Sequence, residues 1–332
     1  MAAYLVRRLL LAIPALVGVS VAVFLLMRAV PGDVAQAILV GPQGEGGSVS
    51  QERYAKLRAE LHLDRPLFID LKHPSHGSQY GEWTWGFIRG DWGKSVRTTR
   101  PILSDISNRF PLTFELATFT MVIAIGLAIP LGILMATRQD SWVDYVARLF
   151  SIGGLAMPSF WVSALMLVIM TKFFQWSPPV GYARLWEHPW ANIKQMIWPC
   201  LSLGYLLAAI IARMTRSSLL DVLRQDYIRT AWSKGLHERV IIYRHALKNA
   251  MLPVVTIVGL QYAALMGGTV VMERLWNLPG VGFSLIDAII ARDYPVVQAL
   301  VMLFAVIILV SNLIVDMTYA WLDPRVRFGH GR

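Results

Sequence analysis

The chain contains few cysteines and few charged residues, and each of these features excludes some classes of function. Its 332 residues contain one cysteine, Cys200, which cannot form an internal disulfide, so cysteine chemistry is not expected to be the function. Charged residues make up 16% of the chain and hydrophobic residues 55%, whereas a soluble domain is about a quarter charged. Water is therefore not the only solvent of this chain.

Signatures of catalysis and of nucleotide binding are also missing. The sequence has no His-Glu-x-x-His, no Gly-x-Ser-x-Gly and no cysteine pair, and His73 and His76 are more simply solvated loop residues than metal ligands. Gly93-Lys94-Ser95 resembles the end of a phosphate-binding loop, but Ile88 stands where that loop needs its first glycine. Ser151-Ile152-Gly153-Gly154 lies in an apolar run and is equally weak as a nucleotide signature. We expect no catalytic site and no metal, cofactor or ATP bound by this chain.

Charge-free runs long enough to cross a membrane are what the sequence has instead. A span needs roughly 20 residues at about 1.5 Å per residue. Six runs come close to or exceed this length: 9–27, 116–137, 149–171, 195–212, 249–272 and 294–315. The next longest, 275–286 and 173–183, are short enough to predict surface or re-entrant segments. A signal peptide is the alternative for the first run, but the run is long and no small-residue cleavage site follows it. We expect an all-α polytopic membrane protein with six transmembrane helices.

The positions of Lys and Arg predict the orientation. In the short loops they lie mainly on the side that a cytoplasmic N-terminus would place inside, so both termini are expected in the cytoplasm. The expected parts are a cytoplasmic N-terminus (1–8), a first transmembrane helix (9–30), an extracytoplasmic loop with an amphipathic helix (31–111), a five-helix core (112–320) that includes a cytoplasmic loop (213–248), and a cytoplasmic tail (321–332).

Several isolated features have simple interpretations. The net charge of +10 does not indicate nucleic acid binding, because the bases sit beside helix ends, where anionic lipid headgroups and partner proteins lie. Pro130, Pro158 and Gly267-Gly268 are expected to kink membrane helices or let them pack closely. Three ionisable residues stand at span ends, where a functional role and a packing role both remain open: Glu115, Glu273 and Asp316.

The two long loops differ in character. In the first, the glycine-rich segment 41–47 predicts a flexible linker, and Ser48 is expected to cap an amphipathic helix that carries Tyr54, Leu57 and Leu61 and ends near Asp64-Arg65-Pro66. The basic loop 213–248 predicts two helices, with helical composition over 219–232 and 238–249 and a left-handed stop at Gly235 between them. A simple connector does not need this length, so the second loop is expected to bind something.

Two segments of the basic loop carry a family resemblance. They are Asp226-Tyr227-Ile228-Arg229-Thr230-Ala231-Trp232-Ser233-Lys234-Gly235-Leu236 and Arg244-His245-Ala246-Leu247-Lys248-Asn249-Ala250-Met251-Leu252-Pro253. They closely resemble the "EAA" loop of the dipeptide and oligopeptide permeases of ABC importers. The resemblance covers nearly the whole chain, through motifs such as Arg89-Gly90-Asp91-Trp92-Gly93-Lys94-Ser95, Met157-Pro158-Ser159-Phe160-Trp161, Arg213-Met214-Thr215-Arg216 and Arg292-Asp293-Tyr294-Pro295.

The resemblance implies a type I importer permease fold in the bacterial inner membrane and a definite set of partners. These are a second, related permease subunit in a heterodimer, two ATPase subunits that use ATP and Mg, and a periplasmic solute-binding protein. It also implies that the basic loop couples the permease to the ATPases, through Asp226, Tyr227, Ile228, Arg229, Thr230, Ala231, Lys234, Gly235, Leu236 and His245.

This sequence departs from the family pattern at a few positions. Arg229-Thr230-Ala231 replaces the Glu-Ala-Ala of the general importer consensus, and a proline comes only at Pro253; both variations are typical of the peptide branch. Trp232 and Tyr243 are less typical of it and leave the ATPase contacts open. The alternative interpretation of the loop is a basic hairpin resting on anionic lipid.

Short peptides are the expected solute, with nickel or glutathione import by the same class as alternatives. No histidine falls within a span, and uncharged spans rich in Met, Ser, Thr and Gly suit a wide, weakly binding passage better than a metal route. Three other classes of membrane protein would need features that the sequence does not offer. A secondary transporter should have inverted repeats and charged residues at the membrane midplane. A channel should have a selectivity filter or a charged ring, and an intramembrane enzyme should have a cluster of catalytic residues.

Overall fold

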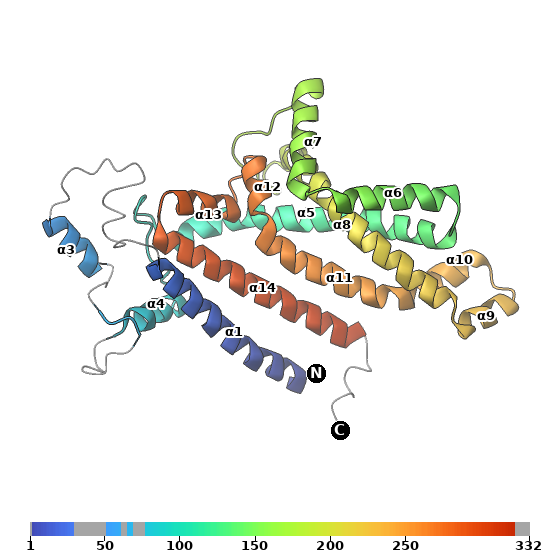
Figure 1. Ribbon diagram of the computed structural model, residues 1–332, viewed down its shortest axis with the longest axis horizontal. Helices are drawn as coiled ribbons and strands as arrows, with labels where there is room; N and C mark the ends of the chain where they lie inside the picture. The colour runs from blue at the N-terminus through green and yellow to red at the C-terminus, as the bar shows by residue number, and fades with distance from the viewer. Residues whose placement is uncertain (1, 30–50, 61–64, 69–76, 323–332) are drawn as a thin grey trace. The chain divides into compact units, whose positions relative to one another are not determined.

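The computed structural model describes residues 2–29, 51–60, 65–68 and 77–322, which form helices joined by turns (Figure 1). The chain divides into two compact units. Unit 1 comprises Met1–Leu5, Leu112–Pro279 and Ile307–Arg332, and unit 2 comprises Val6–Pro111 and Gly280–Val306. The predicted linker 41–47, Ser48, Leu61, His73, His76 and nearly all of the tail lie outside the described residues.

The membrane-crossing helices confirm the all-α membrane fold, while the count of six is not reached in the described part of the chain. Four helical stretches are long and apolar enough to cross a bilayer: Ile102–Thr137 (α5), Pro189–Leu223 (α8), Glu238–Gly267 (α10 to α11) and Tyr294–Val315 (within α14, Tyr294–Leu322). A bent pair, α6 (Trp142–Ala156) and α7 (Ser159–Phe174), makes five if it counts as one span. Helix α1 (Ala2–Ala29) contains a shorter apolar stretch, Leu10–Leu25.

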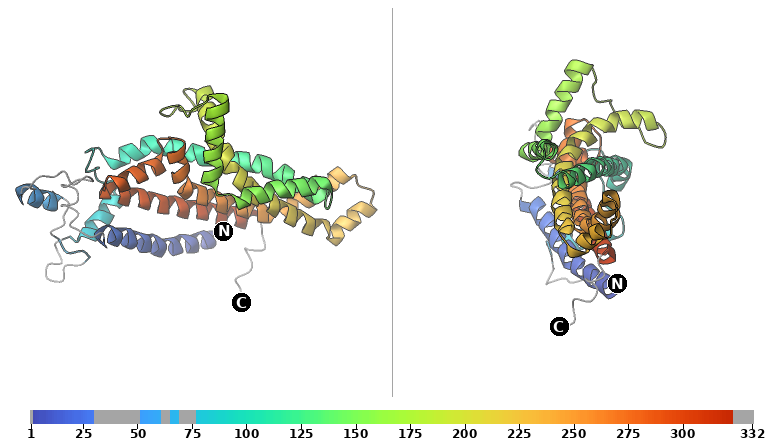
Figure 2. Two further views of the ribbon diagram at one scale, coloured as in Figure 1. Left: turned by 45° about the horizontal axis from the view of Figure 1, so that its top comes forward. Right: turned by 90° about the vertical axis from the view of Figure 1, so that its right-hand side faces the viewer.

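The predicted third span, 149–171, is not one straight helix. Helices α6 and α7 meet at an angle of 103°, and α7 stands across the line of α6 in both views of Figure 2. Met157 adopts an extended conformation (φ −105°, ψ 132°) between them. The break follows from Pro158, because a proline ring disfavours the α conformation in the residue before it.

Other predicted spans also have different ends in the structure. Helix α5 begins at Ile102, well before the charge-free run at 116, and α8 extends from Pro189 to Leu223. The predicted span 249–272 divides into α11 (Leu247–Gly268) and α12 (Val270–Leu275). A charge-free run identifies only the part of a helix that is apolar enough to lie in the hydrocarbon core of the membrane. It therefore does not show where the same helix continues through polar residues.

In unit 1, α8 is the helix against which the others pack. It contacts α6, α7 and α11. Ser163 of α7 donates a hydrogen bond of 2.6 Å to Ser202 of α8, and Tyr205 of α8 donates one of 2.8 Å to the carbonyl of Phe150 in α6. The bent pair is thus held to α8 on both sides of its break.

Unit 2 contains α3 (Gln51–Glu60), α4 (Gln79–Ile88) and α13 (Val281–Ile290). Helix α3 confirms a helix around Tyr54, whereas α4 was not predicted. Ser78 caps α4 by accepting a hydrogen bond of 3.0 Å from the Gly81 amide. Phe24 of α1 is fully buried against the ring of Tyr80, with centroids 5.3 Å apart, and this contact fixes α4 to α1.

The segment that imitates a phosphate-binding loop has a packing role in unit 2. Ser95 is buried and donates a hydrogen bond of 2.5 Å to the Asp293 carboxylate, which also accepts from the amides of Val96 (3.3 Å) and Arg97 (3.4 Å). The hydroxyl that would hold a metal ion in a phosphate-binding loop is therefore used to join two distant parts of the chain.

Candidate functional site

The residues predicted to couple to the ATPases lie in a helical hairpin, 224–248, in unit 1. Its first arm is α9 (Asp226–Ser233), and its second arm is α10 (Glu238–Val240), followed by the π-helical segment η1 (Ile241–Ala246). Helices α9 and α10 lie beyond the ends of α8 and α11, the two membrane helices that the hairpin joins (Figure 1). We call this segment the coupling hairpin.

One face of α9 is anchored in a hydrophobic core. Ile228 is fully buried and Ala231 almost so. They pack in a cluster with residues of α5, α8, η1 and α11: Ile133, Ala136, Leu219, Ile241, Ile242, Ala246 and Ala250. Ile228 and Ala231 were predicted among the coupling residues, and the structure places them where they position α9 and do not form its outer surface.

The opposite face of α9 is exposed. Asp226 and Arg229 form an ion pair of 3.4 Å there, and Thr230 also lies on the surface. Tyr227 is half-exposed, and its hydroxyl accepts a hydrogen bond of 2.7 Å from the Asn249 side chain. An exposed ion pair of this kind contributes little to the stability of the fold. Asp226 and Arg229 can therefore exchange this pairing for contacts with another protein at little cost.

The turn after α9 has the predicted left-handed glycine. Gly235 has φ +72°, its amide donates to the Trp232 carbonyl (2.9 Å), and the Leu236 amide donates to the Ala231 carbonyl (3.4 Å). His237 then starts the second arm by accepting a hydrogen bond of 3.3 Å from the Arg239 amide. Lys234 and Leu236 lie exposed on either side of the glycine. The two arms therefore have a fixed relative geometry.

The second arm contains a feature that sequence reasoning missed. His245, a predicted coupling residue, is half-buried within η1, where the helix widens to π geometry. Such segments are rare and frequently occur at functional sites. Helical composition predicts the arm but carries no signal for its π form.

An ion-pair cluster near the hairpin was also missed. The Asp144 side chain is fully buried, and it accepts from Arg148 Nε (2.9 Å) of its own helix and from Arg216 Nε (3.3 Å) and Nη2 (3.2 Å) of α8. Asp140 supplies a further contact, 3.2 Å from Arg148. The cluster ties the start of α6 to the C-terminal half of α8, the helix that leads into the hairpin.

The acidic residues at span ends have packing partners. Glu273 is fully buried and accepts hydrogen bonds from the hydroxyls of Thr113 (2.7 Å) and Thr269 (3.0 Å). Glu115 accepts one from Tyr182. Burial raises the pKa of Tyr182, and the neighbouring Glu115 carboxylate raises it further, so this hydroxyl stays a donor. The side chain of Asp316 lies outside the described residues.

The comparisons with known proteins agree with this architecture. Residues 128–328 match the family described as "Binding-protein-dependent transport system inner membrane component", and residues 1–117 match its N-terminal region. The chain belongs to this family. It is the permease component of an ABC import system, and the matched range contains the whole coupling hairpin.

Relatives of this permease extend over its full length. It is 38% identical to the dipeptide transport system permease protein DppB of Alkalihalophilus pseudofirmus, over 99% of this chain and 100% of that protein. It is 37% identical to the glutathione transport system permease protein GsiC of Escherichia coli (strain K12), over 98% of this chain and 99% of that protein. The solved inward-facing MetNI methionine ABC transporter has a similar fold, with 14% identity and a TM-score of 0.57 over 68% of this chain and 100% of its own.

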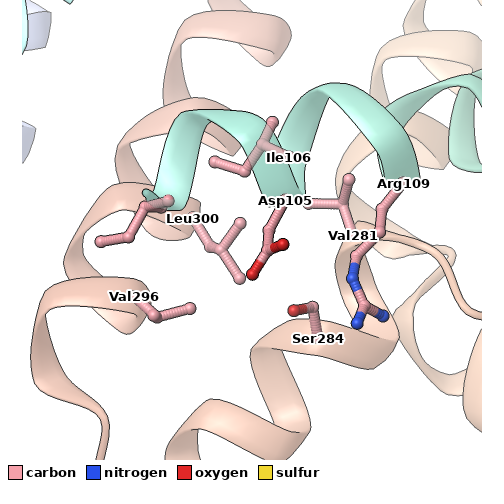
Figure 3. A pocket seen from close by; sticks show the side chains of 8 residues that line it. Asp105, Ile106, Arg109, Val281, Ser284, Val296 and Leu300 are labelled. Carbon is pink, nitrogen blue, oxygen red and sulfur yellow. The ribbon is translucent and has the colours of Figure 1, made fainter. Parts of the chain in front are cut away.

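Two cavities in the described part of the permease differ in character. In unit 1, a groove of about 240 Å³ lies between α5, α11 and α14, and the residues that line it are apolar or carry hydroxyls, with no charge among them: Met121, Val255, Thr256, Val258, Gly259, Tyr262, Ser311, Ile314, Val315 and Thr318. In unit 2, Asp105 points towards Ser284 across a pocket of about 20 Å³, with Arg109 beside them (Figure 3). The second pocket has room for about one water molecule and is too small for a solute.

Proposed function

We propose that this permease imports short peptides. It pairs with a second, related permease, docks two ATPase subunits through the coupling hairpin and receives peptides from a periplasmic binding protein. The charge asymmetry of the loops favours an orientation with both termini in the cytoplasm, and the description of the family as an inner membrane component supports the bacterial inner membrane. The chain itself catalyses no reaction, and the ATPase subunits supply ATP hydrolysis with Mg.

The observation that carries this proposal is the two-sided construction of the coupling hairpin. Ile228 and Ala231 bury one face of α9 in a core shared with α5, α8 and α11, while Asp226, Arg229 and Thr230 lie exposed on the other. A protein that binds the exposed face can move α9 as a rigid body, because close-packed interiors transmit displacement. The helices that share its core then move with it. This is the connection that an ATP-driven permease needs.

The choice of peptide rests on the relatives and the groove. The two relatives are named for dipeptide and glutathione transport, and glutathione is itself a tripeptide. The groove of about 240 Å³ has an uncharged lining with the hydroxyls of Thr256, Ser311 and Thr318. Hydroxyls can hydrogen-bond peptide groups of any sequence without holding them strongly, which suits passage of varied peptides.

A competition assay in cells that contain the complete transporter tests this function. Excess dipeptide or tripeptide should block uptake of a labelled dipeptide, and excess nickel should not. If glutathione alone competes, the solute is one tripeptide and the proposal is too broad. If deletion of this permease abolishes nickel accumulation while peptide uptake continues, the proposal is wrong.

A further inference from the structure

Helix α4 of unit 2 has an exposed apolar side that the proposed function does not use. Trp85 is 55% exposed and Ile88 is 69% exposed, and both lie on the same side of α4 because residues three apart are neighbours on a helix surface. The Arg89 guanidinium lies over the Trp85 ring, 4.5 Å from its centroid. Trp83 and Phe87 pack against each other, with ring centroids 6.1 Å apart. We call Trp85, Ile88 and Arg89 the Trp85 face.

Helix α1 is the predicted first transmembrane helix, and its contacts with α4 fix the level of α4 relative to the membrane. Tyr80 of α4 shares a hydrogen bond of 2.7 Å with Ser20, and its ring lies 5.3 Å from that of Phe24. The Trp83 ring lies 6.1 Å from Phe24. Arg28, the first charged residue after the apolar stretch of α1, is about 6 Å beyond Phe24 along the helix axis. The first two turns of α4 therefore lie where the hydrocarbon ends and the lipid headgroups begin.

The composition of α4 and of the segment after it suits a phospholipid surface. Tryptophan is enriched where a membrane meets water, and a helix that lies in this interface buries its apolar face about 5–10 Å into the boundary between headgroups and acyl chains. Residues 89–100 include one acid, Asp91, and four bases, all of them exposed: Arg89, Lys94, Arg97 and Arg100. Bases near a membrane surface are attracted to anionic headgroups. This part of the chain thus combines an apolar side for the acyl chains with positive charge for the phosphates.

A soluble protein is the other partner that exposed tryptophan and arginine suit, because both residues often carry the binding energy of protein interfaces. The level of α4 disfavours it. The headgroup layer is only about 5–7 Å thick on each side of the membrane. The contacts with Phe24 place the start of α4 within or below that layer. At this level the surroundings of an exposed side chain are lipid.

We propose that α4 is an interfacial helix that anchors unit 2 in one leaflet of the membrane. Trp85 and Ile88 insert among the acyl chains, and Arg89 lies at the level of the phospholipid phosphates. In the orientation proposed above, this is the outer leaflet. The chain continues from α4 to Ser95, whose hydrogen bond with Asp293 joins it to the residue before α14, so the anchor also holds that contact near the membrane surface. The anchor is independent of which solute the permease imports.

The test reads the surroundings of position 88 from a nitrobenzoxadiazole fluorophore on Ile88→Cys, in permease pairs in nanodiscs of phosphatidylethanolamine and phosphatidylglycerol. The native cysteine of this chain, Cys200, is buried and should not react with the fluorophore. Lys234→Cys is the reference for a side chain in water, because Lys234 is exposed in the coupling hairpin. The fluorophore at position 88 should emit at a shorter wavelength than that at 234. Lipids with a nitroxide near the headgroup should quench it at least twice as strongly, and aqueous iodide should quench it less.

A second substitution in the labelled chain tests the role of Trp85. Trp85→Ser should weaken quenching by the nitroxide lipids, because it removes the ring that inserts beside the fluorophore. Trp85→Tyr should retain most of the quenching, since tyrosine also favours the membrane interface. Trp186→Ser is the matched control, because Trp186 is 66% exposed and belongs to unit 1; it should leave the quenching unchanged. Equal unfolding temperatures in detergent show that the variants fold alike.

Two results would overturn the inference. Equal quenching of the fluorophores at positions 88 and 234 by iodide would place α4 in water. A shift to shorter wavelength that occurs at position 88 only after the binding protein is added would assign the Trp85 face to that protein. The proposed function survives both results, because its own test is peptide uptake.

Discussion

Gly259 of α11 and Val315 of α14 approach so closely that a methyl group on Gly259 would lie 2.4 Å from Val315 Cγ2. Two helical turns further along α11, a methyl group on Gly267 would lie 3.0 Å from the Cδ1 atom of Ile308. Close approach through small residues is a common way for membrane helices to associate. The two glycines face side chains of different flexibility. Val315 cannot easily move its methyl groups, because valine is stiff at χ1, whereas the Cδ1 end of Ile308 can rotate away.

This difference predicts unequal effects of the same substitution. Gly259→Ala should destabilise the permease by about 1–3 kcal/mol, the usual cost of overpacking. Gly267→Ala should change the stability by less than about 1 kcal/mol. Thermal unfolding in detergent measures both. Adding Val315→Ala to Gly259→Ala should recover most of the loss; a double variant as unstable as the sum of the two single ones would disprove the contact.

A second prediction concerns the buried carboxylate of Asp144. Asp144→Asn removes the charge that faces Arg148 and Arg216 and should cost about 1.5–3 kcal/mol of unfolding free energy, as for hydrogen bonds to charged groups. Asp140→Asn is the control, because the Asp140 side chain is 66% exposed and its pairing is screened by water. Equal effects of the two substitutions would show that the cluster does not hold α6 to α8.

The contact between Ser95 and Asp293 makes a third prediction. Ser95→Ala leaves the buried carboxylate without its shortest hydrogen bond and should lower the unfolding temperature. Lys94→Ala should leave both unfolding temperature and import unchanged, because Lys94 is exposed and we expect no nucleotide to bind this segment. Loss of import in Lys94→Ala with an intact fold would reopen the nucleotide interpretation of this segment.

Gly235→Val is the fourth prediction. A methyl group at Gly235 would meet no atom within 4 Å, so the substitution acts on the backbone conformation alone. At φ +72° a β-branched residue costs about 1–3 kcal/mol and distorts the turn. Peptide import should collapse while expression and membrane insertion persist. Gly235→Asn, which tolerates this conformation better, should retain more import. If Gly235→Val imports peptide normally, the hairpin only connects α8 and α11 and does not transmit movement.

The sequence predicted those features that depend on local composition. Charge-free runs located four membrane helices and the bent pair, and Gly235 marked the left-handed turn because glycine adopts φ +72° without strain. The 103° bend was underestimated, because Pro158 indicates a break but gives no angle. The contacts of Asp144 with Arg216 and of Asp293 with Ser95 could not be predicted, since each joins elements distant in the sequence and no local pattern encodes it.

The central claim is that this chain is a passive permease that works only with its partners. Its most direct test is uptake of a labelled dipeptide into proteoliposomes with ATP supplied to the ATPase side. The complete set of two permeases, two ATPase subunits and the binding protein should accumulate the dipeptide, and omission of any one component should reduce uptake to the level without ATP. ATP-dependent accumulation by this chain alone would contradict the account.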